Sequence, residues 1–494
     1  METAEGKSKL YFNYLQLLVG IAAFFIVYFL FEAGPELEKA RLTAAVAAII
    51  AVWWVTEAIP LAATSLLPLF LFPLLGILSG RETASAYVNS TIFLFFGGFL
   101  IAIAMEKWNL HKRVSLNVIS VVGTNASKII LGFMLASAFL SMWISNTATA
   151  VMLLPIGLAI IKKLEKDFDE ENIKKFSLAL LLGIAYACSI GGIGTLIGTP
   201  PNLVFKRVYS ISFPDKPEIL FSEWMLFAIP ISIIMLFVVW LLLTEFFFKP
   251  SKKLIIDKDI VAREKNELGK ISFEEKSVAV VLSTAAFFWI FRKKIETGIF
   301  TLPGWSNLFP NPDLIDDGTV AVFFAFLLFV IPAKKSDGEK FLLSTKDFRS
   351  VPWEIILLFG GGFALAQGFL SSGLSGIIGE QFAYLKGINI YLIIVIICLT
   401  ITFLTELTSN TATAQIILPI LASMALQLEV DPKLIMIPAT LSASMAFMMP
   451  VATPPNAIIF GSGRIRVVEM ARVGIILNLI GAIVISVFVY LFFN

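Results

Sequence analysis

Charged residues, cysteine and histidine are scarce in this chain. Of its 494 residues only 15% are Asp, Glu, Lys or Arg, and there are 2 cysteines and 1 histidine. So little charge could not cover the surface of a soluble protein of this length. The net charge of +2 gives no electrostatic reason to expect a nucleic-acid partner. Both Cys188 and Cys398 lie in apolar segments, so neither a disulfide nor a metal site is expected.

An enzyme is not expected either. His111, the single histidine, lies in the polar string 107–113, which fits a solvated interface. No pair of aspartates falls inside an apolar run, so an intramembrane hydrolase would have neither a base nor an acidic pair.

Long hydrophobic runs are abundant instead. Hydrophobic residues make up 58% of the chain, and the mean hydropathy is +0.87. Runs able to cross about 30 Å of hydrocarbon recur along the whole length. We therefore predict an all-α polytopic membrane protein with eleven transmembrane spans. The spans are expected near 13–33, 40–59, 61–78, 92–106, 178–205, 222–246, 277–292, 318–333, 354–370, 434–460 and 469–493.

The distribution of basic residues predicts the orientation of the chain in the membrane. Loops 249–276 and 334–349 are rich in Lys and Arg, which favours the cytoplasm, whereas 297–317 carries aspartates and no basic residue. These loops place the N-terminus inside and the C-terminus outside, with Lys206, Arg207 and Lys216 as a minor exception. The apolar run after the polar N-terminus is too long for a cleaved signal.

Two polar strings occur twice, in the same order. The string SNTATA is found at 145–150 and 409–414, and the string TPPN follows at 199–202 and 453–456. The segments 96–100 and 359–363 also resemble each other, at the separation found for the SNTATA pair. The TPPN pair lies closer together, so the first half has extra residues, which the charged segment 162–175 can supply. An odd number of predicted spans separates the SNTATA copies, which predicts inverted repeats.

Each SNTATA string lies near the middle of an apolar stretch, 127–164 or 388–425, that is too long for one span. We predict two re-entrant helical hairpins with these strings at their tips, because irregular backbone at that depth must line a protein cavity. Glycine and proline near both TPPN strings predict two broken helices. Half-helix N-termini suit carboxylates and half-helix C-termini suit Na⁺.

The polar residues of the apolar segments also allow structural interpretations. Ser and Thr are common where transmembrane helices pack closely, but their duplication beside proline breaks favours a binding site. Glu57 and Glu406 are expected to be buried in apolar surroundings, where an acid is functional by default. Either could instead pin a broken helix, and we favour that interpretation. Glu106 and Glu354 fall near span ends and are expected at the interface.

Together these motifs resemble the divalent anion/sodium symporter family, which carries di- and tricarboxylates. The resemblance covers nearly the whole chain and includes 54–61 (WVTEAIPL), both SNT strings, 189–192 (SIGG) and 450–457 (PVATPPNA). It implies eleven spans, two hairpins, a homodimer and an elevator movement of a transport domain against a scaffold. On that division, 127–248 and 388–494 form the transport domain, and 1–126 and 249–387 are mainly scaffold.

The resemblance also implies the binding residues. The substrate carboxylates would contact Asn146, Thr147, Asn410, Thr411, Thr453 and Pro454. One sodium ion would bind near Ser141, Ser145, Asn146 and Gly194, and the other near Thr405, Thr408, Asn410 and Ala452. Thr408 departs from the alanine expected in relatives, although a backbone carbonyl ligand would survive that change. In the first broken helix both 194–195 and 198–199 can be aligned with 452–453.

The leading hypothesis is a sodium-coupled importer of C4-dicarboxylates such as succinate, malate and fumarate, in the plasma membrane. Two intact SNT strings fit a pair of matching carboxylate clamps. A sodium-independent exchanger, or a citrate or sulfate carrier on the same scaffold, is the alternative. The exchanger would need fixed cationic side chains near the motifs, and none is present there. Proton coupling through Glu57 or Glu406 is a third possibility, and a channel would lack the paired hairpins.

Overall fold

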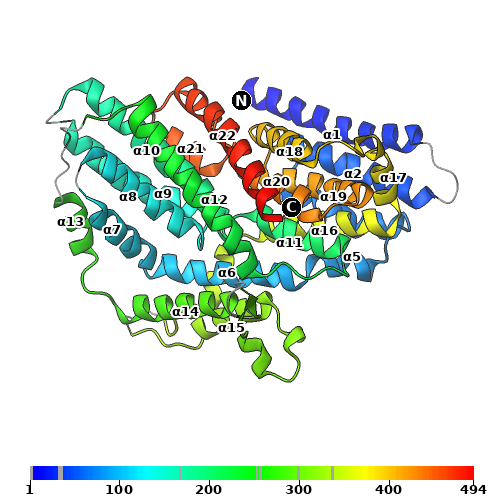
Figure 1. Cartoon of the computed structure of the whole chain (residues 1–494), viewed down its shortest axis with the longest axis horizontal. Helices are drawn as coiled ribbons and strands as arrows, with labels where there is room; N and C mark the ends of the chain where they lie inside the picture. The colour runs from blue at the N-terminus through cyan, green and yellow to red at the C-terminus, as the bar shows by residue number, and fades with distance from the viewer. Residues whose placement is uncertain are drawn as a thin grey trace.

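The computed structural model describes residues 4–31, 37–123, 125–165, 168–251, 254, 259–296, 301–334 and 339–493. Its side chains are described from Tyr14 onward. The chain is built from helices, and the strands within these ranges are one short antiparallel pair, β1 (Ile295–Glu296) and β2 (Thr301–Leu302). The all-helical prediction is therefore confirmed (Figure 1).

Ten helices form two corresponding series around the repeated motifs. The first series is α8 (Ala126–Ser141), α9 (Asn146–Leu164), α10 (Glu170–Gly192), α11 (Pro200–Ser212) and α12 (Phe221–Leu241). The second is α18 (Ile390–Thr405), α19 (Asn410–Leu428), α20 (Pro432–Ser442), α21 (Pro454–Phe460) and α22 (Val467–Phe493). In both series the chain breaks at the predicted places, after the first helix and after the third.

The remaining helices surround these two series. Before the first come α1 (Ala4–Leu30), α2 (Glu38–Thr56), α3 (Leu61–Thr64), α4 (Leu67–Leu74), α5 (Gly80–Tyr87), α6 (Ser90–Lys107) and α7 (Leu110–Val122). Between the two series come α13 (Asp259–Glu267), α14 (Phe273–Ile290), α15 (Asp317–Leu328), α16 (Trp353–Ser371) and α17 (Leu374–Glu380). The short helices α5, α7, α13 and α17 were not predicted.

Within the described ranges, eight helical segments are long and apolar enough to cross a membrane. Two of them, Asn146–Leu164 and Asn410–Leu428, are the second arms of the two hairpins. Every predicted span has a helix at its position, but several are short. The span predicted at 61–78 is two short helices, and Pro68 lies in the first turn of the second, where proline is tolerated. The count of eleven crossing spans stays a prediction.

The two series are interlocked. The hairpin of α8 and α9 lies at the left of Figure 1, and the hairpin of α18 and α19 lies at the right. After its break, the first broken helix continues as α11, which packs against α19 and α20 of the other series. The second continues as α21, which packs against α9 and α10. Each hairpin therefore contacts the second half of the other series' broken helix. This packing brings the two hairpin tips and the two helix breaks together in the middle of the molecule.

The extra residues of the first series lie mainly in a helix and not in a loop. Helices α9 and α19 have 19 residues each, whereas α10 has 23 residues and α20 has 11. The charged residues from Glu170 to Lys175 begin α10, where the side chain of Asp169 caps the helix. The expectation that a charged loop accounts for the extra length is corrected accordingly.

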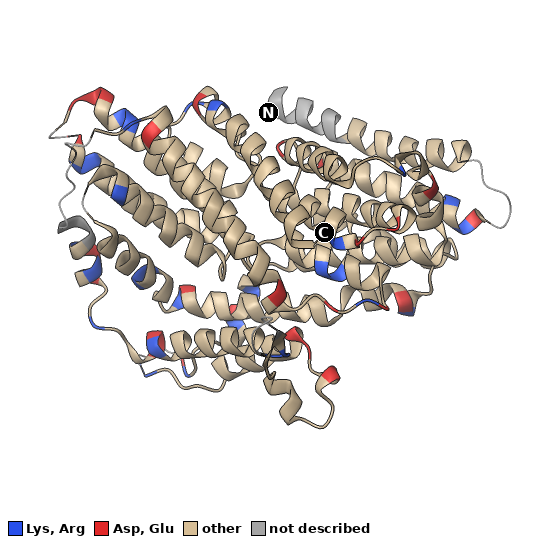
Figure 2. Cartoon of the chain, viewed as in Figure 1, with Lys and Arg blue, Asp and Glu red and all other residues tan. Residues whose placement is uncertain are grey.

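Polar and apolar residues are distributed as expected for a chain surrounded by lipid. Lys, Arg, Asp and Glu gather at helix ends and connecting segments, and the middles of α9, α10, α12 and α22 lack them (Figure 2). Large apolar side chains remain exposed on the outer helices, among them Phe29 at 75% and Leu491 at 76%. Such extended apolar surface marks contact with a membrane or a partner.

Candidate functional site

The first hairpin tip is built by an ordinary helix cap. Helix α9 begins at Asn146, and the side-chain oxygen of Ser145 accepts a hydrogen bond from the backbone N–H of Ala148 at 3.1 Å. This is the capping role in which serine is favoured. The hydroxyl of Ser141, at the end of α8, donates to Oδ1 of Asn146. The side chain of Asn146 is thus oriented by the helix that precedes the tip.

The second tip repeats this contact and differs in its cap. Thr405 Oγ1 lies 2.6 Å from Asn410 Oδ1 and 2.9 Å from the carbonyl oxygen of Ala443. Ser409 makes no side-chain cap here. Instead, the hydroxyl of Thr408 lies 2.6 Å from that of Thr413 and ties the tip to α19. Thr408, which replaces the alanine expected in relatives, therefore has a local structural role.

An asparagine closes each break in the two broken helices. Asn202 Nδ2 donates to the carbonyls of Gly192 at 3.2 Å and Thr195 at 2.7 Å. Asn456 Nδ2 donates to the carbonyls of Ala446 and Met449, both at 3.1 Å. Both asparagines are fully buried. The last residue of each TPPN string thus satisfies carbonyls freed by the break, as buried backbone groups require.

The two breaks correspond at Thr199 and Thr453. Thr199 precedes α11 with φ −144° and ψ 142°, and Thr453 precedes α21 with φ −139° and ψ 149°. Of the two alignments left open by the sequence, this geometry favours Gly198–Thr199 as the counterpart of Ala452–Thr453. Gly194 instead packs beside the hairpin tip, where an added Cβ would lie 3.0 Å from Cε of Met142.

Glu406 pins the second broken helix, as favoured from the sequence. Its carboxylate accepts hydrogen bonds from the backbone N–H groups of Phe447, Met448 and Met449 at 2.6, 2.8 and 3.0 Å. Asn478 Nδ2 donates to the same carboxylate at 2.7 Å. Four donors satisfy this buried charge and hold the irregular segment 443–453 in place.

Glu57 differs from Glu406, and the expectation that it is buried is wrong. Its side chain is exposed and lines the cavity described next. The cause is local, since α2 ends at Thr56 and Glu57 takes a left-handed conformation with φ 49°. Pro60 then turns the chain into α3.

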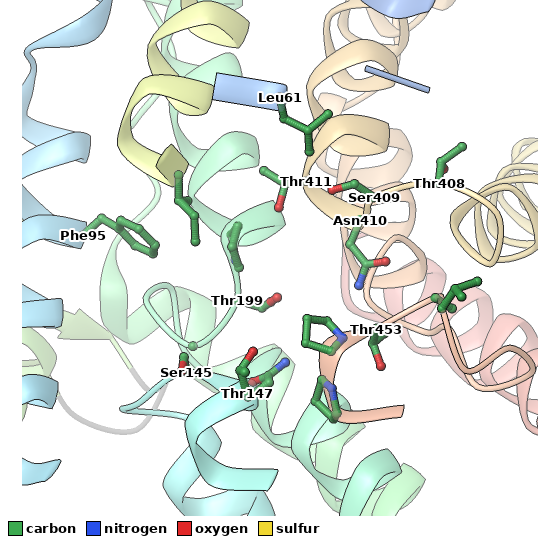
Figure 3. A pocket seen from close by; sticks show the side chains of 18 of the residues that line it. Leu61, Phe95, Ser145, Thr147, Thr199, Thr408, Ser409, Asn410, Thr411 and Thr453 are labelled. Carbon is green, nitrogen blue, oxygen red and sulfur yellow. The ribbon is translucent and has the colours of Figure 1, made fainter. Parts of the chain in front are cut away.

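Both tips and both breaks line one cavity of about 540 Å³. Figure 3 shows Ser145 and Thr147 on one side of it and Ser409, Asn410 and Thr411 on the other, with Thr199 and Thr453 between them. The predicted residues that line the cavity are Ser145, Asn146, Thr147, Thr408, Asn410, Thr411, Ala452, Thr453 and Pro454. Ser141, Gly194 and Thr405 are buried behind the lining.

Several lining residues were absent from the predicted site. Thr199 and Pro200 are the counterparts of Thr453 and Pro454, so the TPPN repeat itself was a signal that could have found them. Phe95, Trp143 and Leu407 border the cavity with apolar surface. Within the described residues the lining contains no Lys, Arg or His, and Glu57 is its one ionisable side chain.

Neutral oxygen atoms gather beside the first tip. A Cβ added to Gly192 would lie 2.9 Å from Asn146 Oδ1 and 3.1 Å from the carbonyl oxygen of Gly198. One added to Gly198 would lie 2.4 Å from the carbonyl oxygen of Gly192 and 3.0 Å from that of Ser141. The described residues hold no cluster of His, Cys, Asp and Glu suited to a transition metal. Carbonyl and amide oxygens at a broken helix suit an alkali cation.

A polar cavity without positive charge, enclosed by paired hairpins and broken helices among apolar helices, is typical of a secondary transporter. The inverted placement of the two repeats stays a prediction. Comparison with known proteins agrees with the transporter class. The chain belongs to the family described by the model "Sodium:sulfate symporter transmembrane region", which matches residues 12–494.

Curated relatives are similar over almost their whole length. The sodium-dependent dicarboxylate transporter SdcS of Staphylococcus saprophyticus is 44% identical over 491 residues, which are 98% of this chain and 92% of that protein. SdcS of Staphylococcus aureus strain MSSA476 is 45% identical over 479 residues, covering 96% and 90%.

Two solved structures share the fold at low identity. The antimetabolite efflux pump MtrF of Neisseria gonorrhoeae has a TM-score of 0.56 at 12% identity, covering 84% of this chain and 83% of that one. The transporter YdaH of Alcanivorax borkumensis has a TM-score of 0.54 at 13% identity, covering 92% and 98%.

Proposed function

We propose that this protein is a sodium-coupled symporter that carries C4-dicarboxylates such as succinate, malate and fumarate across the plasma membrane. The observation that carries the proposal is the cavity where both SNT strings and both TPPN strings meet. Two relatives named sodium-dependent dicarboxylate transporters are 44% and 45% identical to this chain. Sodium is then a co-transported substrate and not a resident cofactor.

The proposed clamp for the dianion uses amides, hydroxyls and helix ends. Asn146 and Thr147 would hold one carboxylate, and Asn410 and Thr411 the other, because each pair lines the cavity and begins a helix, where anions are favoured. Thr453 and Pro454 would complete the site from the second break. Without a fixed cation, affinity stays modest, which favours release on the other side of the membrane.

The sodium ions would supply the missing positive charge. Ser141, Ser145, Asn146 and Gly194 would surround one ion, and the carbonyl oxygens of Gly192 and Gly198 are further candidate ligands. Thr405, Thr408, Asn410 and Ala452 would surround the other. In both sites the asparagine contacts ion and dianion, so that binding of one favours binding of the other.

Movement and assembly follow from the family resemblance. In an elevator mechanism, the transport domain of residues 127–248 and 388–494 would move as one body against the scaffold of residues 1–126 and 249–387, within a homodimer. The interlocking of α11 with α19 and α20, and of α21 with α9 and α10, supports treating both repeats as a single moving unit.

The test is uptake of labelled succinate into vesicles that contain the purified protein. We expect uptake with Na⁺ outside and little with K⁺ or choline, and equal uptake in all three would refute sodium coupling. Unlabelled malate and fumarate should compete strongly, and citrate and sulfate weakly. Strong competition by sulfate alone would favour the sulfate carrier instead, and vesicles without protein serve as the control.

A further inference from the structure

Glu57 is the one ionisable residue of the cavity within the described chain, and its charge has the sign of the proposed substrate. Its carboxylate makes no hydrogen bond or ion pair with any described residue. Glu406, by contrast, has four hydrogen-bond donors around it. Glu57 therefore lacks the pinning role that accounts for the other acid.

The backbone at Glu57 gives no structural reason for a glutamate. The residue ends α2 in the left-handed region with φ 49°. That position favours glycine or asparagine, because other side chains are strained there. A charged residue that lines a cavity at a strained backbone position is typical of a functional residue.

The carboxylate of Glu57 repels a dianion in the same small space and attracts Na⁺. For any two unit charges about 10 Å apart, at an effective dielectric constant of about 20, the attraction changes the occupancy of a monovalent ion by about tenfold. Solvent in the open cavity reduces this to roughly three- to tenfold.

We propose that the charge of Glu57 concentrates Na⁺ in the cavity and disfavours the dianion when sodium is absent. This inference rests on the proposed sodium-coupled function and adds a residue outside the hairpins and broken helices. Glu57 belongs to the segment before α3, so its effect reaches the ion sites through space and not through coordination.

The test compares Glu57→Gln, which removes the charge, with Glu57→Asp, which keeps it. Sodium binding without substrate is titrated by tryptophan fluorescence, for which Trp143 in the cavity wall is a natural reporter. We expect Glu57→Gln to raise the half-saturating sodium concentration roughly three- to tenfold. Succinate KM at saturating sodium should stay unchanged or fall, and Glu57→Asp should remain near wild type.

Glu354→Gln is the matched control. Glu354 is an exposed acid in the first turn of α16 and does not line the cavity, so its neutralisation should leave the sodium titration unchanged. An unchanged half-saturating concentration in Glu57→Gln would overturn the inference, as would equal shifts in Glu57→Gln and Glu57→Asp. If the wild-type protein itself ignores sodium, the proposed symport fails first and the inference fails with it.

Discussion

At the scale of single residues, the two tip asparagines are the most informative. Asn146 and Asn410 both line the cavity, and each is oriented by a hydroxyl five positions earlier, Ser141 or Thr405. In each case a buried hydroxyl contacts an asparagine of the cavity lining. The two hydroxyls therefore fix the orientation of the two asparagines.

Replacing either asparagine should reduce uptake strongly. A hydrogen bond to a charged group contributes about 1.5–3 kcal/mol, so Asn146→Ala or Asn410→Ala should lower succinate uptake by about 10- to 100-fold. Uptake is measured in vesicles at equal protein content, with the oligomeric state compared with wild type by size-exclusion chromatography. Asn266→Ala, on exposed α13, is the control and should behave as wild type. Wild-type uptake in both tip variants would remove these residues from the site.

At the scale of elements, buried charges join α11 to the helices that precede the second repeat. Lys206 on α11 pairs with Asp317 at the start of α15. Arg292, just after α14, binds the other carboxylate oxygen at 2.8 Å and also contacts Glu218 at 2.9 Å. The side chains of Arg292 and Asp317 are only 2% and 1% exposed. Lys206, an exception to the expected charge distribution, is thus neutralised by a local partner.

The members of this network should differ in their effect on stability. Asp317→Asn leaves two buried cations without their shared partner and should cost about 3–5 kcal/mol. Lys206→Met should cost less, because Asp317 keeps its bond to Arg292. Thermal unfolding of the purified variants in detergent measures both. Equal melting temperatures for the two variants would show that Asp317 is not the centre of the network.

Sequence patterns predicted the elements of the site better than their exact contacts. Duplicated SNTATA and TPPN strings located the tips and breaks, because polar residues inside apolar runs leave few structural choices. The pinning role of Glu406 was favoured correctly, yet its partners Phe447, Met448 and Asn478 are set by tertiary packing. Glu57 was misplaced, since a left-handed turn at the end of α2 cannot be read from hydropathy.

At the scale of the whole molecule, the arrangement of the repeats explains why one cavity suffices. Each broken helix runs from its own repeat to the hairpin of the other, so neither repeat can form the site alone. A structural change at one hairpin tip therefore alters the contacts of both repeats. This mutual dependence suits coupled transport, in which ions and dianion must be bound and released together.

The orientation of the molecule can be tested with single cysteines, because both native cysteines are buried. Lys265 on α13 and Asp313 between α14 and α15 are exposed, and only α14 separates them in the chain among the predicted spans. If basic loops face the cytoplasm, a membrane-impermeant thiol reagent added to intact cells should label Asp313→Cys and not Lys265→Cys. Permeabilised cells should label both, and the wild-type protein should stay unlabelled. Labelling of Lys265→Cys alone would invert the orientation, and labelling of both in intact cells would mean that α14 does not cross the membrane.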